Sequence, residues 1–271
     1  MSEAIRPAAV DGRFYPGSPD QLAAEVRSLL AAVPARVECP GLLKALIVPH
    51  AGYRYSGPIA ASAYSLLRKR RGAIRRVVLL GPVHRVPIRG LALPAAQSFA
   101  TPLGTVPVDR EAVSALLALR QVSVSLAAHA EEHSLEVQLP FLQQVLGEFT
   151  LVPLAVGDAS PEEVAEAIEA VWGGSETLIV VSSDLSHYLP YERARRIDAE
   201  TCSAIGSLAR SVSHEEACGG TPINGLMLAA RRHKLAPTLL DLRNSGDTSG
   251  VRGQVVGYAA FAFREEVANA R

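Results

Sequence analysis

Three apolar runs in this sequence end shortly before side chains that can bind a metal or move a proton. One run ends before His50, another before His84, and a third before Asp184 and His187. A single histidine in such a place more often caps a strand or satisfies a turn, but three run ends with the same chemistry favour one convergent site. Neutral imidazole is the commonest metal ligand, and two histidines with one anionic ligand form a familiar site for non-haem Fe(II). The sequence therefore predicts a metal centre built from histidines and one anionic group.

The remaining ligand of such a centre must come from Asp184, His187 or a thiolate. Cys218 is the best-placed thiol, because the two glycines that follow it allow the backbone to approach closely and a helix is predicted to begin near Pro222. A helix N-terminus favours a thiolate over a thiol. The spacing alone leaves open that Cys218 is a small, inert core residue.

Two short patterns resemble metalloprotease motifs. The segment from His129 to His133 fits H-x-x-E-H, the inverted zincin pattern, but it also reads as a loop that leads into a helix. A single five-residue match carries a high risk of chance, so we expect His133 and Glu136 to line a pocket rather than to form a protease site. The segment from His214 to Cys218 is an H-E-x-x-H pattern with cysteine in the last place, and we expect His214 to lie on the surface.

The elements that must position these side chains alternate between strand and helix. Runs rich in Val, Ile and Leu predict buried strands at Leu43–Val48, Val77–Leu80, Leu151–Val156, Leu178–Val181 and Val255–Phe263, with a weaker candidate at Thr238–Leu242. Amphipathic spacing predicts helices at Ser18–Val33, Pro58–Lys69, Asp109–Leu119, Ser134–Leu146, Pro161–Trp172, Tyr191–Leu208 and Pro222–Lys234, with Pro140 expected to kink or split the fourth. The alternation predicts one α/β sandwich around a mostly parallel sheet, over residues 1–271. Ligands of such folds bind beyond the carboxyl ends of the strands.

Composition narrows the function further. The chain has 271 residues, with 27 basic and 27 acidic side chains, so its net charge gives no electrostatic footprint for nucleic acid. No apolar run approaches the ~18 residues of a membrane span, and the first residues lack the apolar core of a signal peptide. Three cysteines without a C-x-x-C pair argue against a disulfide framework and favour the cytoplasm. Cys202 is expected to pack in a helix, and Cys39 to lie in a loop.

The ordered motifs of the chain resemble those of the Memo family, also called the B component of the AmmeMemoRadiSam system. The matching segments are RPAAV at 6–10, FYP at 14–16, PHAGY at 49–53, YSG at 55–57, GPVH at 81–84, EHSLEVQLPFL at 132–142, SSDLSHY at 182–188, CG at 218–219 with PI at 222–223, SGD at 245–247 and VVGYAAFAF at 255–263. They run from near the N-terminus to near the C-terminus. So many ordered matches are far more specific than any single motif.

The resemblance implies a fold similar to the class III extradiol dioxygenases, with an α/β sandwich around a mostly parallel or mixed sheet. It implies that His50, His84 and Cys218 are the metal ligands and that His187 acts as acid or base, with Asp184 close by. Tyr53 of the PHAGY segment is expected to line the pocket. The dioxygenases carry a glutamate where this sequence carries cysteine, and a softer thiolate favours Cu(I), Zn or a different Fe potential.

Three functions compete on these grounds. The first is a non-haem metal protein with redox or oxygenase chemistry on an unknown substrate, for which Fe(II) is the expected metal and Cu or Zn the alternatives. The second is a non-catalytic module that binds a peptide or protein in the same pocket. The third is zinc-dependent hydrolysis. We expect a small molecule or peptide as partner and no nucleic acid or membrane, and the resemblance adds a functional link to a radical-SAM protein.

Overall fold

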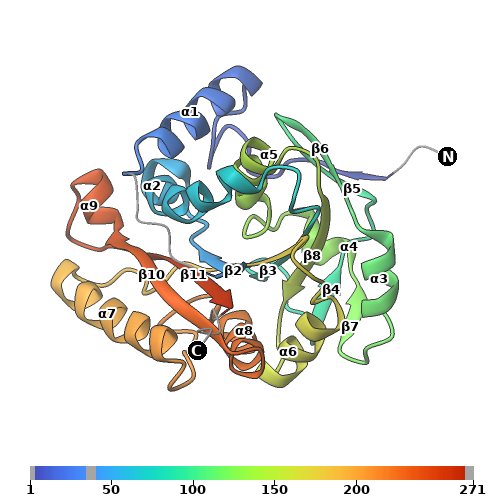
Figure 1. Ribbon diagram of the computed structural model, residues 1–271. Helices are drawn as coiled ribbons and strands as arrows, with labels where there is room; N and C mark the ends of the chain where they lie inside the picture. The colour runs from blue at the N-terminus through green and yellow to red at the C-terminus, as the bar shows by residue number, and fades with distance from the viewer. Residues whose placement is uncertain (1–3, 35–40, 266–271) are drawn as a thin grey trace.

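The computed structural model describes residues 4–34 and 41–265, and it arranges them in three layers (Figure 1). A twisted mixed sheet forms the middle layer. Helices α1, α2 and α5 cover one face, and helices α6, α7 and α8 cover the other. The helices are α1 (Pro19–Ala31), α2 (Tyr53–Tyr64), the 3-10 turn η1 (Ser65–Arg70), α3 (Arg110–Leu116), α4 (Leu126–Ala130), the 3-10 turn η2 (Glu136–Gln138), α5 (Leu139–Leu146), α6 (Pro161–Ala170), α7 (Tyr191–Ser207), α8 (Gly220–Arg232) and α9 (Ser245–Ser249).

Four parallel strands form the centre of the sheet. The order of the eight strands is β10-β11-β2-β9-β3-β8-β4-β7, and the run β2-β9-β3-β8 is parallel throughout. The strands are β2 (Leu43–Val48), β3 (Arg76–Pro82), β4 (Leu91–Leu93), β7 (Val122–Val124), β8 (Thr150–Val156), β9 (Thr177–Ser182), β10 (Leu235–Asn244) and β11 (Gly257–Glu265). Strands β10 and β11 add antiparallel to one edge, and β4 pairs antiparallel with β8. The sheet is therefore mixed around a parallel centre, as expected.

Successive side chains of the central strands point to opposite faces of the sheet, and both sets are apolar, so helices cover both faces. In β2, Leu46 and Val48 pack into the core beneath α1, α2 and α5, whereas Ala45 and Ile47 pack toward α6 and α8. Strands buried on both faces read as continuous apolar runs, which is why the sequence predicts them well. The expected strands at 43–48, 77–80, 151–156, 178–181, 238–242 and 255–263 all correspond to strands of this sheet.

The short strands outside the apolar runs were not predicted. A separate three-stranded sheet has the order β1-β5-β6 and contains β1 (Ile5–Arg6), β5 (Ser98–Thr101) and β6 (Gly104–Pro107). Its strands are two to four residues long, too short to show a period.

The sequence contains two prolines, Pro58 and Pro140, that bear on where the predicted helices begin or break. Helix α2 begins at Tyr53 and contains Pro58, so the prediction of a start at Pro58 was wrong by five residues. Pro140 lies in the first turn of α5, where a missing N–H costs nothing, and it follows the 3-10 turn η2. The predicted split of the 134–146 segment is therefore confirmed.

A buried ion pair fastens the N-terminal segment to the core. Arg6 is 4% exposed and Glu136 is fully buried, and the Arg6 guanidinium donates to the Glu136 carboxylate. The same carboxylate accepts from the backbone N–H groups of Ala9 and Val10 and from the Tyr15 hydroxyl at 2.5 Å. Four donors thus compensate one buried charge, as burial of a carboxylate requires.

Within the described residues, no helix is long and apolar enough to cross a bilayer. Cys202 packs in α7 and is buried, as expected for a structural thiol. Cys39 lies outside the described residues.

Removal of the Arg6 charge should destabilise the protein strongly. We expect Arg6→Met to lower the free energy of unfolding by about 3–5 kcal/mol, because it leaves the buried Glu136 carboxylate without its cation. Urea denaturation monitored by circular dichroism measures the change. Arg195→Met is the matched control, because Arg195 forms an exposed pair with Glu192 and should change the value by less than about 0.5 kcal/mol. Equal stabilities of the Arg6 variant and the wild type would contradict the assignment.

Candidate functional site

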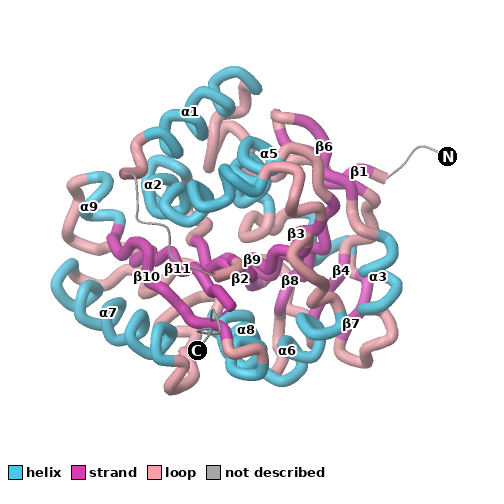
Figure 2. The backbone as a smooth tube through the Cα atoms, in the orientation of Figure 1, coloured by secondary structure: helices cyan, strands magenta, loops and turns pink. Residues whose placement is uncertain are grey.

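A cavity of about 650 Å³ lies beyond the carboxyl ends of the parallel strands. His50 follows β2, His84 follows β3, and Asp184 and His187 follow β9, and all four side chains line this cavity. Strands β2, β9 and β3 are adjacent and parallel, so the loops that leave them emerge at one edge of the sheet (Figure 2). The predicted convergence of the three run ends is therefore found in the structure.

Three imidazole rings meet in the cavity, one more than the two that the anion-plus-two-histidine pattern requires. The rings of His50 and His84 lie 5.2 Å apart between centroids, and His133 lies 5.4 Å from His50 and 4.7 Å from His84. One ring nitrogen from each of the three lies within 4.8 Å of the others, a grouping that could hold a metal ion. His133 was expected only to line the pocket, and the structure places it inside the histidine cluster.

Buried hydrogen bonds fix the tautomer of His50. Its Nδ1 lies 3.0 Å from the Ser182 hydroxyl, which donates its single proton to the Ser134 carbonyl at 2.6 Å. The same hydroxyl accepts from the Gln138 side-chain amide, whose oxygen accepts from the Tyr64 hydroxyl. With its own proton committed, the Ser182 oxygen can only accept from His50, so Nδ1 carries the hydrogen. His50 Nε2 is thereby left without a hydrogen and with a lone pair to share, as a metal ligand requires.

Glu132 orients the other two rings of the cluster. Its carboxylate lies 2.9 Å from His84 Nδ1 and 3.3 Å from His133 Nδ1, and it also accepts from the backbone N–H groups of His84, His133 and Ser134. Burial alone would raise the pKa of Glu132, but the hydrogen bonds and charge of His84 lower it to about 2. A carboxylate that receives Nδ1–H leaves Nε2 free, which is the usual arrangement behind a metal-binding histidine.

Two rings of the cluster, His50 and His133, favour the neutral form. Burial, and then the proximity of the other histidines, lowers the pKa of His50 well below its usual range. Burial also lowers the pKa of His133 to about 4, despite the nearby Glu132 charge. Neutral rings offer lone pairs, so the site suits a cation and disfavours protons.

Cys218 lies beside His50, immediately before helix α8. Its Sγ is 3.3 Å from His50 Nε2 and 3.7 Å from the Asp184 carbonyl oxygen. Burial and then the Asp184 charge raise the pKa of Cys218 to about 12, and they outweigh the backbone hydrogen bond of Gly219 at the start of α8, which acts in the expected direction and lowers it. His214 is exposed, as expected, and its ring contacts the Cys218 carbonyl and the Thr221 hydroxyl.

Asp184 and His187 lie on the loop after β9 and complete the polar wall of the cavity. The Asp184 carboxylate accepts from the backbone N–H of His50 at 2.8 Å, and burial raises its pKa to about 7. Burial lowers the pKa of His187. Asp184 therefore fixes the backbone of a histidine in the cluster, and His187 presents a ring to the same cavity.

Two residues that were expected in the pocket lie elsewhere in the structure. Glu136 is fully buried and serves the N-terminal ion pair, and Tyr53 is buried with its hydroxyl donating to the Val137 carbonyl at 2.8 Å. His129 ends a short helix and its Nε2 contacts the Ala92 carbonyl, so it does not join His133 in a zincin-like pair.

Sequence reasoning missed Glu132 and Ser182 as supports of the cluster. Glu132 stood in the H-x-x-E-H pattern but was considered only as a protease residue. Ser182 stood in the SSDLSHY segment without a role of its own. In each case the usable signal was a polar residue next to a histidine or at the end of an apolar strand.

Comparison with known proteins places the chain in a family. A family model described as Memo-like protein matches residues 6–262. MEMO1 family proteins align over nearly the full length of both chains: MK0963 of Methanopyrus kandleri is 35% identical and covers 96% of this chain and 99% of its own, and the relative from Archaeoglobus fulgidus is 36% identical and covers 96% and 100%. The chain belongs to the Memo family.

A solved structure supports the fold of this Memo-family protein. The crystal structure of the uncharacterized protein JW3007 from Escherichia coli K12 aligns with a TM-score of 0.52 over 81% of this chain and 99% of its own, at 12% sequence identity. At that identity the likeness concerns the fold alone. The resemblance to the Memo family that the motifs indicate is thus confirmed over nearly the whole chain.

Glu132 should tune the affinity of the histidine cluster for a metal. We expect Glu132→Gln to weaken the binding of added Fe(II) or Zn²⁺ by about 10–100-fold, because the amide no longer offers the rings a charged acceptor. Competition with a chelator measures the affinity. Glu131→Gln is the matched control, since Glu131 is the neighbouring acid and is exposed. The role assigned to Glu132 is wrong if both variants bind as the wild type does.

Proposed function

We propose that this Memo-family protein is a non-haem metal protein that performs redox or oxygenase-type chemistry on a small molecule in the histidine cavity. The supporting observation has two parts. Fixed partners engage the Nδ1 atoms of His50 and His84, and one ring nitrogen from each of the three histidines lies within 4.8 Å of the others. A purely structural cluster would not need three converging imidazole rings on the wall of an open cavity.

The three histidines form a group that could hold an ion, and Cys218 lies beside one of them. Two ligands of one tetrahedral ion, one nitrogen and one sulfur, stand roughly 3.5 Å apart. The distance of 3.3 Å between Cys218 Sγ and His50 Nε2 matches that separation. We propose that His50, His84 and Cys218 hold the ion, with His133 beside them as a further nitrogen donor. The thiolate would supply the anionic ligand that imidazole side chains do not provide.

Fe(II) is the metal we propose, with Cu and Zn as the alternatives that elemental analysis distinguishes. When bound, such an ion supplies a redox-active or Lewis-acidic centre. The protein contributes the rest: Glu132 and Ser182 hold the ring orientations, and Asp184 holds the His50 backbone. We propose that the protein acts in the cytoplasm.

His187 is the group we propose for proton transfer. It lines the cavity, it carries no hydrogen bond to the Glu132 carboxylate, and burial favours its neutral form, which can accept a proton from a substrate. Asp184 lies on the same loop and lines the same cavity. The two side chains therefore stand where a bound molecule meets both the histidine cluster and a base.

A binding module is the second function that the structure supports. Tyr188 and Val251 are both 68% exposed and both line the cavity mouth, with Tyr55 beside them. Exposed aromatic and apolar side chains around an opening are typical of surfaces that receive a peptide. Tyr188→Ser separates the two functions: it should reduce peptide binding strongly, and it should leave the metal content unchanged.

The sulfur ligand can be tested directly. We expect X-ray absorption on the metal-loaded protein to show a sulfur in the first shell, at about 2.3 Å if the metal is Zn. Cys218→Ser should remove that shell and weaken metal binding by more than about tenfold, because a neutral hydroxyl replaces a thiolate. Cys202→Ser is the control, since that thiol is buried in the helix α7. A first shell of nitrogen and oxygen alone, unchanged in Cys218→Ser, would exclude the thiolate.

His187 should be separable from the metal ligands. We expect His187→Ala to keep the wild-type metal content and to lose proton-coupled turnover, whereas His50→Ala and His84→Ala should each lose the metal while the protein stays folded. Elemental analysis of the purified variants measures the content, and circular dichroism reports folding. Loss of metal from His187→Ala to the same extent as from His50→Ala would make His187 a ligand.

A further inference from the structure

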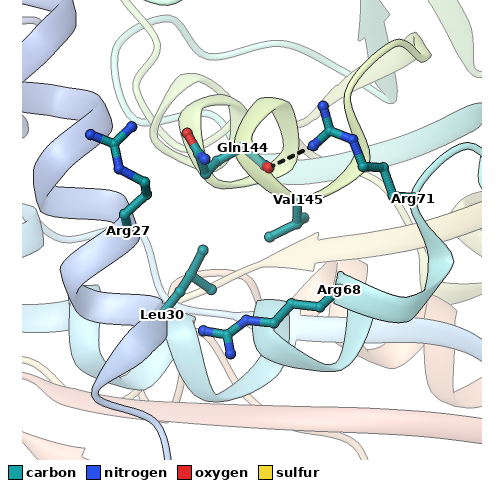
Figure 3. Close-up of a pocket in the computed structure, with 6 residues that line it drawn as sticks. All are labelled: Arg27, Leu30, Arg68, Arg71, Gln144 and Val145. Carbon is teal, nitrogen blue, oxygen red and sulfur yellow. Dashed lines mark hydrogen bonds between the residues drawn. The ribbon is translucent and has the colours of Figure 1, made fainter.

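A second cavity, of about 270 Å³, lies between helix α1, the turn η1 and helix α5. Figure 3 shows three arginines on separate sides of it, with two apolar side chains between them. The lining residues are Arg27, Leu30, Arg68, Arg71, Gln144 and Val145. None of them lines the histidine cavity, so the two cavities are separate.

The three guanidinium groups lack anionic partners within the described part of the chain. Every ion pair found there joins other groups, and neither Arg27 nor Arg68 donates a hydrogen bond to another described residue. Arg71 donates only to the Gln144 backbone carbonyl, at 3.2 Å.

Like charges that line one cavity repel each other, and no ion pair between described residues engages Arg27, Arg68 or Arg71. Arg68 and Arg71 belong to the run Arg68-Lys69-Arg70-Arg71, and Arg27 is added by a helix about 40 residues earlier in the chain. The net charge of zero therefore conceals a local positive excess at one place on the surface. An anion bound in the cavity would be attracted by all three guanidinium groups and would offset their mutual repulsion.

The chemistry of arginine indicates which anionic group would bind, and the cavity volume limits the size of the molecule that carries it. The planar guanidinium fork matches the oxygens of a phosphate group in a bidentate way, more specifically than a lysine point charge does. The volume is below that of cavities that hold drug-sized ligands, which excludes a large nucleotide. Leu30 and Val145 offer an apolar surface between the arginines, which suits a short carbon skeleton next to the charge.

We propose that this arginine cavity binds the phosphate group of a small phosphorylated molecule. The site is distinct from the histidine cavity and does not depend on the function proposed for it. Because the guanidinium groups are exposed, binding should weaken as the salt concentration rises.

Calorimetric titration of the full-length protein with pyrophosphate and with inorganic phosphate tests the proposal. We expect saturable binding of one pyrophosphate per chain in low salt. Arg27→Gln and Arg68→Gln should each weaken the affinity by roughly tenfold. Both residues are exposed and make no hydrogen bond, so the variants should fold, and an unchanged unfolding midpoint without ligand verifies this. Arg71 is left intact, because its bond to Gln144 also supports the fold.

Arg70→Gln is the matched control. Arg70 lies in the same turn and its removal takes away the same charge, but its side chain does not line the cavity. We expect this variant to bind pyrophosphate within about twofold of the wild type. An equal loss in Arg70→Gln would show diffuse charge attraction and would overturn the proposal.

Two further outcomes would also overturn it. One is the absence of saturable binding of either probe up to about 10 mM. The other is binding to anionic vesicles or to a polyanion such as heparin, lost in Arg27→Gln, with no binding of the small phosphates. That result would make the cluster a docking surface for a membrane or a polymer instead of a small-molecule site.

Discussion

One buried guanidinium supports the framework behind the histidine cluster. Arg6 contacts the Glu136 carboxylate and also donates to the backbone carbonyls of His129 and Glu132. It therefore holds both ends of the segment that carries Glu132 and His133, two of the groups that shape the site. The buried Glu136 carboxylate must keep its partners, because an unpaired carboxylate in the core costs several kcal/mol of stability. The position of the imidazole rings depends on that pairing.

The rings of His50 and His84 are each held in one tautomer, but by different kinds of acceptor. A neutral relay through Ser182 and Gln138 fixes one tautomer, and a charged acceptor, Glu132, fixes the other. A neutral relay adds no charge to the core, whereas a carboxylate makes the ring it contacts more basic. The cluster is therefore electrically asymmetric, with the negative side at the loop before η2. A cation between the rings would feel that asymmetry directly.

The strand ends were predictable because buried parallel strands leave a continuous apolar signal, and polar residues that interrupt it stand out. This is why His50, His84, Asp184 and His187 were found from the sequence. The state of Cys218 could not be read in that way, because the effect of a helix N-terminus is smaller than that of burial beside Asp184. Tyr53 and Glu136 were misplaced for a related reason: proximity in sequence to site motifs does not say which face of an element points inward. The short strands β1, β5 and β6 carry no periodic signal at all.

The sequence separation of the contacts in the cluster has a consequence for biosynthesis. Cys218 Sγ meets His50 across 168 residues, and Arg6 meets Glu136 across 130. Closing such long loops costs chain entropy that only the completed sheet offsets, so these contacts form late in folding. A nascent chain on the ribosome holds His50 and His84 long before it holds Cys218. The contact between Cys218 and His50 can thus form only after most of the chain has left the exit tunnel, so the polar surroundings of His50 are completed late in synthesis.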